Sequence, residues 1–342
     1  MIRTLLLAFL ACLTVACGQP EDHEDGSSDT TNPLLWEIAR ADGPDAGKVE
    51  GWLLGTIHAL PDNAEWRSWS VDRVIADADI LAVEVADLGD GRAMASAFLP
   101  LAFSAGQPPL TTRVPLAQRE RLTELVEQSS YRLEDFSRIE SWGAALILAQ
   151  TVRTDTDIKN GVDRALIEDF GRRQIVELEG ARAQFLAFDS LSEEAQRTML
   201  AAIVDESQAD PAYRMRPVTL YLAGDADGLE RLTHDGMLEN AEIRDALLAR
   251  RNASWVAPIE KLLAGEPQPL IAVGAAHMVG EDGLVALLRA KGYTVRRLDG
   301  AVLPLLSLTL APNSGALRRH VHPWRRGGPK TNYTRISKGS IR

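Results

Sequence analysis

The chain of 342 residues is long enough for one large or two ordinary domains with a substantial core. With 45% hydrophobic and 25% charged residues, its composition is that of a soluble globular protein. A net charge of −11 argues against a general nucleic-acid-binding protein, so we expect no nucleic-acid partner.

Residues 1–17 have the features of a secretory signal peptide. Arg3 precedes an apolar run over residues 5–16 that is too short for a good transmembrane helix. The sequence LTVAC resembles a bacterial lipobox, with Thr14 where leucine is commoner. We therefore expect an exported lipoprotein, anchored to a membrane through Cys17 and facing the periplasm or the cell exterior. A soluble signal peptide that is cut nearby is the alternative.

The segments around the predicted domain differ from it in composition. Both cysteines lie in the signal peptide, so the mature domain has no disulfide and no thiol ligand or nucleophile. Residues 18–32 are polar and acidic, which predicts a disordered linker. Residues 303–342 are basic and hold few core-forming side chains, which predicts a disordered tail. The folded domain is expected over 33–302.

Within that domain, apolar runs and helical periodicities alternate. Strands are predicted at 34–40, 48–57, 78–87, 174–179, 269–273 and 293–298. Helices are predicted at 70–78, 116–128, 141–152, 162–172, 181–187, 192–206, 211–223, 226–233, 241–264 and 281–290. Alternating strands and helices predict an α/β fold, and the helix-rich middle of the chain predicts a largely helical insertion or cap over its sheet.

Two of these strands end in the same short motif. LLGTIH (53–58) and IAVGAAH (271–277) are apolar runs that finish with Gly-x-x-His. Ligands bind beyond the carboxyl ends of strands in open α/β sheets, and parallel strands carry such ends to one edge. We therefore expect His58 and His277 to meet in a functional site. The alternative is that each is an ordinary hydrogen-bonded histidine; His234, in a polar turn, is expected at the surface.

Two further strands end in acidic residues. Glu84 interrupts the apolar run ILAVEVA, and a buried carboxylate is costly unless it is paired or metal-bound. We expect it near the two histidines; alternatively, the strand ends at residue 83 and Glu84 reaches solvent. In QIVELE, alternation does not separate Glu177 from Glu179, but position at the strand end favours Glu179.

One arginine falls within the apolar arc of the predicted helix 241–264. On an ideal helix Arg251 lies inside this arc and Asn252 lies near its edge. The arc consists of Ile243, Leu247, Trp255, Ile259 and Leu262. An arginine at such a position must extend to solvent, pair with a carboxylate or reach a ligand.

Together these segments resemble the TraB/PrgY/GumN family, which includes the Tiki proteins that cleave Wnt. The matching segments are LLGTIH, the strand with Glu84, GVDRALIEDFGRRQIVELEGARAQ (161–184), LLARRNASW (247–255) and IAVGAAHMVGEDGLVALLRAKGYTV (271–295). More distant relatives look like the erythromycin esterases and the ChaN haem-binding proteins. The resemblance implies an α/β fold with a central mixed sheet over about 34–300, with the site at the carboxyl ends of the strands.

The resemblance also implies a function. For Tiki-like members it implies divalent-metal-dependent peptide hydrolysis, in which His58, Glu84 and His277 would bind Zn²⁺, Mn²⁺ or Co²⁺. Glu84 could instead be the general base, and Arg251 or Asn252 would stabilise the oxyanion. The alternatives are an esterase-like hydrolase in which histidine activates water without a metal, and a non-catalytic protein that binds a peptide, haem or a metal ion. The expected substrate is a peptide or another small molecule.

Overall fold

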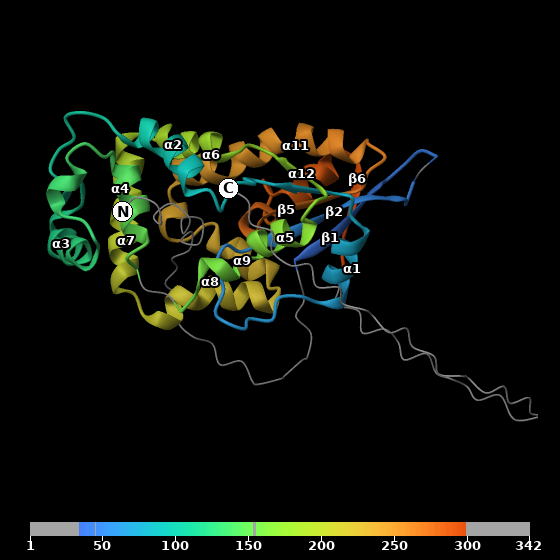
Figure 1. Ribbon diagram of the computed structural model, residues 1–342, viewed down its shortest axis with the longest axis horizontal. Coiled ribbons are helices and arrows are strands. Elements are labelled where there is room, and N and C mark those ends of the chain that lie inside the picture. Colours follow the sequence, from blue (N-terminus) through green and yellow to red (C-terminus); the bar gives the residue numbers. More distant parts are fainter. Residues whose placement is uncertain (1–33, 45, 153–154, 299–342) are drawn as a thin grey trace, which may run out of the picture. The chain divides into compact units, whose positions relative to one another are not determined.

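A mixed sheet forms the centre of the fold. The computed structural model describes residues 34–298 apart from 45, 153 and 154, and within them six strands pair in the order β4-β3-β5-β2-β1-β6 (Figure 1). The strands are β1 (Leu35–Arg40), β2 (Val49–Thr56), β3 (Ile80–Val83), β4 (Gln174–Glu177), β5 (Pro269–Gly274) and β6 (Tyr293–Arg297). Neighbours from β4 to β2 are parallel, whereas β1 is antiparallel to β2 and β6. The predicted α/β fold with a mixed sheet is confirmed.

One α-helix precedes β3, one follows β5, and the other α-helices that the structure describes lie between these two strands in the chain. In chain order, the α-helices are α1 (Trp69–Asp77), α2 (Gly91–Ala102), α3 (Arg119–Gln128), α4 (Ser141–Ala149), α5 (Val162–Phe170), α6 (Ala181–Asp189), α7 (Glu193–Gln208), α8 (Pro211–Ala223), α9 (Ala226–Leu232), α10 (Ala241–Arg244), α11 (Arg250–Leu263) and α12 (Leu284–Ala290). The predicted helix 241–264 includes a π-helical turn, Asp245–Ala249, between α10 and α11.

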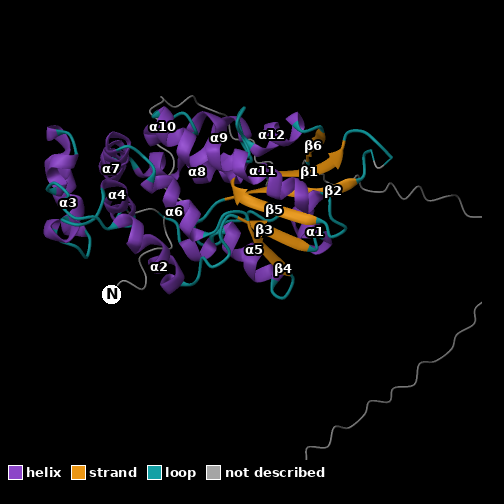
Figure 2. Ribbon diagram, turned by 90° about the horizontal axis from the view of Figure 1, so that it is seen from above, coloured by secondary structure: helices purple, strands orange, loops and turns teal. Residues whose placement is uncertain are grey.

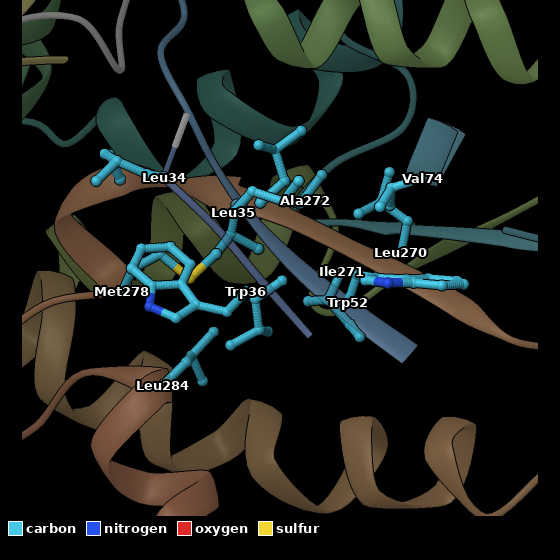
Figure 3. Close-up of a cluster of buried hydrophobic side chains, with 14 of the residues drawn as sticks. Leu34, Leu35, Trp36, Trp52, Val74, Leu270, Ile271, Ala272, Met278 and Leu284 are labelled. Carbon is cyan, nitrogen blue, oxygen red and sulfur yellow. The ribbon is translucent and has the colours of Figure 1, made fainter. Parts of the chain in front are cut away.

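Two apolar clusters hold these elements together. The first surrounds the sheet and includes Trp36, Trp52 and Ile271, all buried (Figure 3). The second joins α2, α3, α4, α6 and α7, which gather beside one end of the sheet (Figure 2). All four residues of β3 are buried, as expected for a strand inside a parallel sheet with both faces covered.

Two elements differ from the sequence prediction. Helix α2 was not predicted, because Gly91 and Pro100 usually interrupt helices. The Asp90 side chain caps the first turn, and burial of Met94 and Phe98 stabilises the rest. The strand predicted at 78–87 covers only the residues of β3, since the chain leaves the sheet directly after it.

Three predicted segments lie outside the described residues. These are the signal peptide (1–17), the linker (18–32) and the tail (303–342). In the part of the chain that the structure describes, none of the helices is both long and apolar enough to span a membrane.

Candidate active site

The carboxyl ends of three strands bring the predicted site residues together. His58 follows β2, Glu84 follows β3 directly, and His277 lies in a short 3₁₀ turn after β5. Because β2 and β3 both pair in parallel with β5, these ends meet at one edge of the sheet. A Cβ atom on Gly274 would lie 3.4 Å from Glu84 Oε1, 3.6 Å from His277 Cδ2 and 3.9 Å from His58 Nε2. The three side chains therefore converge on one point.

An aspartate orients His58. Asp163, in the first turn of α5, places its Oδ2 atom 3.0 Å from His58 Nδ1. This pairing puts the proton on Nδ1 and leaves the Nε2 lone pair free to accept one. Burial alone would lower the pKa of His58, but the charge and hydrogen bond of Asp163, together with the charge of Glu84, outweigh it and raise the pKa above its ordinary value.

Glu84 is buried and ionised. Its Oε2 atom accepts a hydrogen bond of 2.6 Å from Arg251 Nη2 and one of 3.3 Å from Gln184 Nε2. Its Oε1 atom accepts a bond of 2.8 Å from Gly274 N. Burial alone would raise the pKa of Glu84, but Arg251 and the two histidines lower it to about 2. Although β3 ends at residue 83, Glu84 does not extend to solvent.

Arg251 is buried, and each N–H group of its guanidinium has an acceptor. Its five N–H groups reach Glu179 from Nε and Nη2, Glu84 from Nη2, and Leu247 O and His277 Nε2 from Nη1. The sequence left three possibilities for Arg251: extension to solvent, pairing with a carboxylate or contact with a ligand. In the structure it pairs with two carboxylates. The guanidinium fixes Glu84 and is not available to an incoming ligand.

The structure also separates the two acids of QIVELE. Glu179 pairs with Arg251 at 2.5 Å, and its side chain is only 8% exposed. Glu177 is exposed and accepts a hydrogen bond from Ala86 N at 2.8 Å. Burial raises the pKa of Glu179 despite the opposing charge of Arg251. Glu179 is therefore the one that belongs to the site.

Asn252 fixes the tautomer of His277. Its Nδ2 atom donates to Asp282 O at 2.8 Å, so its Oδ1 atom faces His277 Nδ1 at 2.6 Å. His277 therefore carries its proton on Nδ1 and accepts from Arg251 through Nε2 at 3.1 Å. Burial, followed by the charge of Arg251, lowers the pKa of His277 to about 3, so the ring is neutral at neutral pH.

A small cavity opens beside His58 and Glu84. Its volume is about 40 Å³, which is enough for a water molecule. The polar and charged residues that line it are Thr56, His58, Glu84, Asp163, Arg164 and Gln184, and the other lining residues are apolar. Arg251, Asn252 and His277 are not among these lining residues; we call them the backing cluster, because they lie behind Glu84 and hold it.

The sequence profile of the TraB/PrgY/gumN family matches residues 34–297, well over half of the chain. The chain belongs to the TraB/PrgY/gumN family. The family resemblance drawn from the sequence is thereby confirmed. No significant match was found among curated proteins or among solved structures.

In this TraB/PrgY/gumN protein, sequence reasoning missed two residues that contact the predicted site. Asp163 pairs with His58 and Gln184 contacts Glu84. Asp163 shares an apolar helical face with Leu166 and Phe170, three and seven residues further on, and all three are buried. The same test that singled out Arg251 applies to this aspartate, so the sequence did contain a signal for it.

The predicted ligand set does not fit a divalent metal in this arrangement. Arg251 Nη1 contacts the only free lone pair of the His277 ring, and the same guanidinium binds Glu84. His277 Nε2 and Glu84 Oε1 are 4.0 Å apart. Across the described residues, no group of three or more His, Cys, Asp or Glu side chains is placed to hold a metal ion. A metal shared by His58, Glu84 and His277 would require Arg251 to withdraw.

Proposed function

We propose that this TraB/PrgY/gumN protein is a hydrolase in which His58 is the general base that activates water. The observation that carries the proposal is the pairing of His58 Nδ1 with Asp163 at 3.0 Å, which leaves Nε2 available beside a cavity. A histidine held by a carboxylate and open on its other nitrogen is a common arrangement in general-base catalysis. Its raised pKa suits a group that takes up and returns a proton.

The proposed reaction is hydrolysis of a peptide or ester bond. His58 Nε2 takes a proton from water as the water oxygen attacks the carbonyl carbon. The same proton passes to the leaving amine or alcohol as the C–N or C–O bond breaks, which returns His58 to its neutral form. Asp163 and the ionised Glu84 stabilise the imidazolium that forms between these steps.

Gln184 is the proposed donor to the developing oxyanion. It lines the cavity, and the described structure pairs one of its two amide hydrogens, with Glu84. Arg251 and Asn252 were the sequence-based candidates for this role, but all their side-chain N–H groups that face the site are engaged with other acceptors. We therefore assign the backing cluster a positioning role: it holds Glu84 and keeps His277 neutral.

Metal-dependent hydrolysis is the second candidate. It is favoured by the convergence of His58 Nε2, Glu84 Oε1 and His277 on the space over Gly274. The contacts of Arg251 oppose it, so we derive no catalytic step through a metal. Elemental analysis of the purified protein distinguishes the two candidates, because only the second requires stoichiometric Zn²⁺, Mn²⁺ or Co²⁺ that is lost in His58→Ala and His277→Ala.

The test of the hydrolase proposal is cleavage of a peptide library and an ester panel, followed by mass spectrometry. His58→Gln is expected to lower kcat about a hundredfold or more, because the general base is removed. His234→Gln is the matched control, since His234 is exposed and is expected to leave kcat unchanged. Activity that survives exhaustive chelation supports the metal-free reaction. Tight binding of peptide or haem with no cleavage of any compound would contradict both candidates and favour a binding protein.

Export and lipid anchoring through Cys17 are part of the proposal for the whole chain. They are supported by the composition of residues 1–17 and by the lipobox-like LTVAC. Recovery of the protein with the membrane fraction of the producing cell, outside the cytoplasm, is the expected result.

A further inference from the structure

One charged residue of the cavity has no role in the mechanism above. Arg164, in the first turn of α5, lines the cavity and is half-buried. It makes no hydrogen bond and no ion pair with any residue that the structure describes. Its Nη1 atom is 3.9 Å from the position of a Cβ on Gly89, in the loop before α2, so the guanidinium extends toward that loop. A half-buried cation without a counter-ion loses hydration and gains little in return.

Two acidic residues near Arg164 have other partners. Asp163 binds His58, and Asp157 accepts from Lys159 N at 2.8 Å and pairs with Lys159 Nζ at 3.5 Å. The hydrogen bond from Lys159 N is the largest cause of the lowered pKa of Asp157, and burial opposes it; the charge of Lys159 lowers the pKa further, and the charge of Arg164 makes the smallest contribution. The charges that set the pKa of His58 come from Asp163, Glu84 and Arg251 instead. The guanidinium of Arg164 lies beside the loop before α2, which carries none of the groups assigned to the reaction.

The other residues that line the cavity on this side of the site are mostly apolar. This apolar wall is formed by Val85, Leu88, Met94, Ile158, Phe185 and Phe188. An aliphatic or aromatic group can pack against such a surface, and these apolar residues offer no counter-ion to a cation. The guanidinium presents a planar fork of N–H donors that matches a carboxylate in two parallel hydrogen bonds.

We propose that Arg164 binds a carboxylate of the substrate while a neighbouring apolar group of the same substrate packs against this apolar wall. This inference rests on the proposed hydrolase function and names its substrate class: anionic peptides or acyl compounds that carry a carboxylate close to an apolar group. The carboxylate is either a free C-terminus or an acidic side chain. Glu84 and Asp163 give the inner cavity negative charge, so an anionic substrate depends on Arg164 for entry.

The experiment compares peptide libraries that differ only in charge. One pair has identical sequences with a C-terminal carboxylate or a carboxamide, and the second pair has glutamate or glutamine at one internal position. Cleavage and equilibrium binding are both measured with the full protein, its Arg164→Gln and Arg164→Lys variants, and Arg172→Gln as the control. Arg172 is exposed just beyond α5 and does not line the cavity.

The wild-type protein is expected to prefer the carboxylate member of one pair at least about tenfold, as for a charge-assisted hydrogen bond. Arg164→Gln should abolish the preference through KM, with kcat and Tm nearly unchanged, whereas Arg164→Lys should restore part of it and Arg172→Gln should retain it. A preference within the first pair identifies a free C-terminus as the carboxylate that binds, and a preference within the second pair identifies an acidic side chain. Equal behaviour of both members of both pairs, or a preference that persists in Arg164→Gln, would overturn the inference.

Binding separates this inference from the proposed function. If nothing is cleaved but carboxylate peptides still bind in an Arg164-dependent way, hydrolysis is refuted and the subsite stands. If cleavage occurs without charge preference, the hydrolase stands and the subsite is refuted. If the protein neither cleaves nor binds any peptide, both are refuted.

Discussion

At the scale of single residues, the site depends on a glycine, Gly274, because a side chain at this position would enter the site. Gly274 ends β5 with φ −48° and ψ 137°, a conformation that any residue can adopt. Its backbone therefore does not require glycine. Glycine is needed instead for the space above its Cα atom, where Glu84, His58 and His277 come within 4 Å of one point.

Gly274→Ala is expected to abolish turnover while preserving the fold. The added methyl group would lie 3.4 to 3.9 Å from its nearest neighbours, which are ordinary van der Waals distances. It would occupy the space between Glu84 and the Nε2 atom of His58, where the proposed reaction brings water and substrate together. We expect kcat to fall about a hundredfold or more, with the change in Tm limited to a few degrees. Steady-state kinetics and thermal unfolding measure the two effects.

Gly265→Ala is the matched control, for which we expect lower stability and an unchanged kcat. A Cβ on Gly265 would lie 3.2 Å from Leu262 O, beyond the end of α11 and away from the cavity. Full activity of Gly274→Ala would show that catalysis does not use the space above β5.

At the scale of elements, the loop before α5 sets the relation of His58 to Asp163. Val162 N donates to Ile57 O at 2.9 Å, which fixes the first turn of α5 against the end of β2. Gly161 packs so closely on the His58 carbonyl that a Cβ there would overlap it. His58 and Asp163 are therefore positioned by backbone contacts as well as by their own hydrogen bond.

Gly161→Ala is expected to damage stability and activity together. The methyl group would meet backbone atoms of His58, which cannot move aside as a flexible side chain can. We expect a loss of about 1–3 kcal/mol in the free energy of unfolding and a tenfold or greater fall in kcat as Asp163 separates from His58. Urea unfolding and kinetics measure these changes. Lys159→Ala, in the same loop with a side chain 82% exposed, should change neither, and an active, stable Gly161→Ala would contradict the positioning role of the loop.

The elements also show what could be predicted from the sequence. Apolar runs that end in Gly-x-x-His located His58 and His277 at strand ends, and the parallel topology brought them to one edge. Helical periodicity placed Arg251 on a buried face. This periodicity did not identify the carboxylates that pair with Arg251, because the pairing depends on packing between elements far apart in the chain. The pairing of Asp163 with His58 escaped prediction for the same reason.

Secondary-structure periodicity has a further limit in the helix that carries Arg251. The π-helical turn Asp245–Ala249 has the sequence DALLA, which holds no glycine or proline to mark an interruption. An ideal helix over 241–264 therefore gave the right face for Arg251 but not the local widening just before it. Such turns depend on tertiary contacts and are often found near functional sites. Arg251 Nη1 donates to Leu247 O inside this turn at 3.0 Å.

At the scale of the whole molecule, the cavity lies where two apolar clusters meet. Val83 and Ala272 of its lining belong to the cluster around the sheet, whereas Val85, Met94 and Phe185 belong to the helical cluster. Both clusters must be folded for the cavity to exist. The stability of the helical cluster therefore bears on function, although most of it lies away from His58.

A buried acid weakens the helical cluster at neutral pH and above. Glu206 lies on α7 next to the cluster members Ile203 and Val204, and it is only 5% exposed. Burial raises its pKa to about 7 from an ordinary 4.5, and the charge of Arg214 only partly opposes this. The folded state therefore binds a proton that the unfolded state releases between these two values. This contribution to stability is complete below pH 4.5 and is lost as the pH rises to about 7.

Glu206→Gln is expected to stabilise the protein at pH 8 and to have little effect at pH 4.5. A shift from 4.5 to about 7 corresponds to roughly 3 kcal/mol in the free energy of unfolding, which glutamine recovers because it is never ionised. Urea unfolding at the two pH values measures the gain. His277, whose low pKa gives a slope of the opposite sign between pH 6.5 and about 3, is present in both proteins and cancels in the comparison. Glu194→Gln, at an exposed position of α7, should show no such pH-dependent gain, and equal effects of Glu206→Gln at both pH values would contradict the prediction.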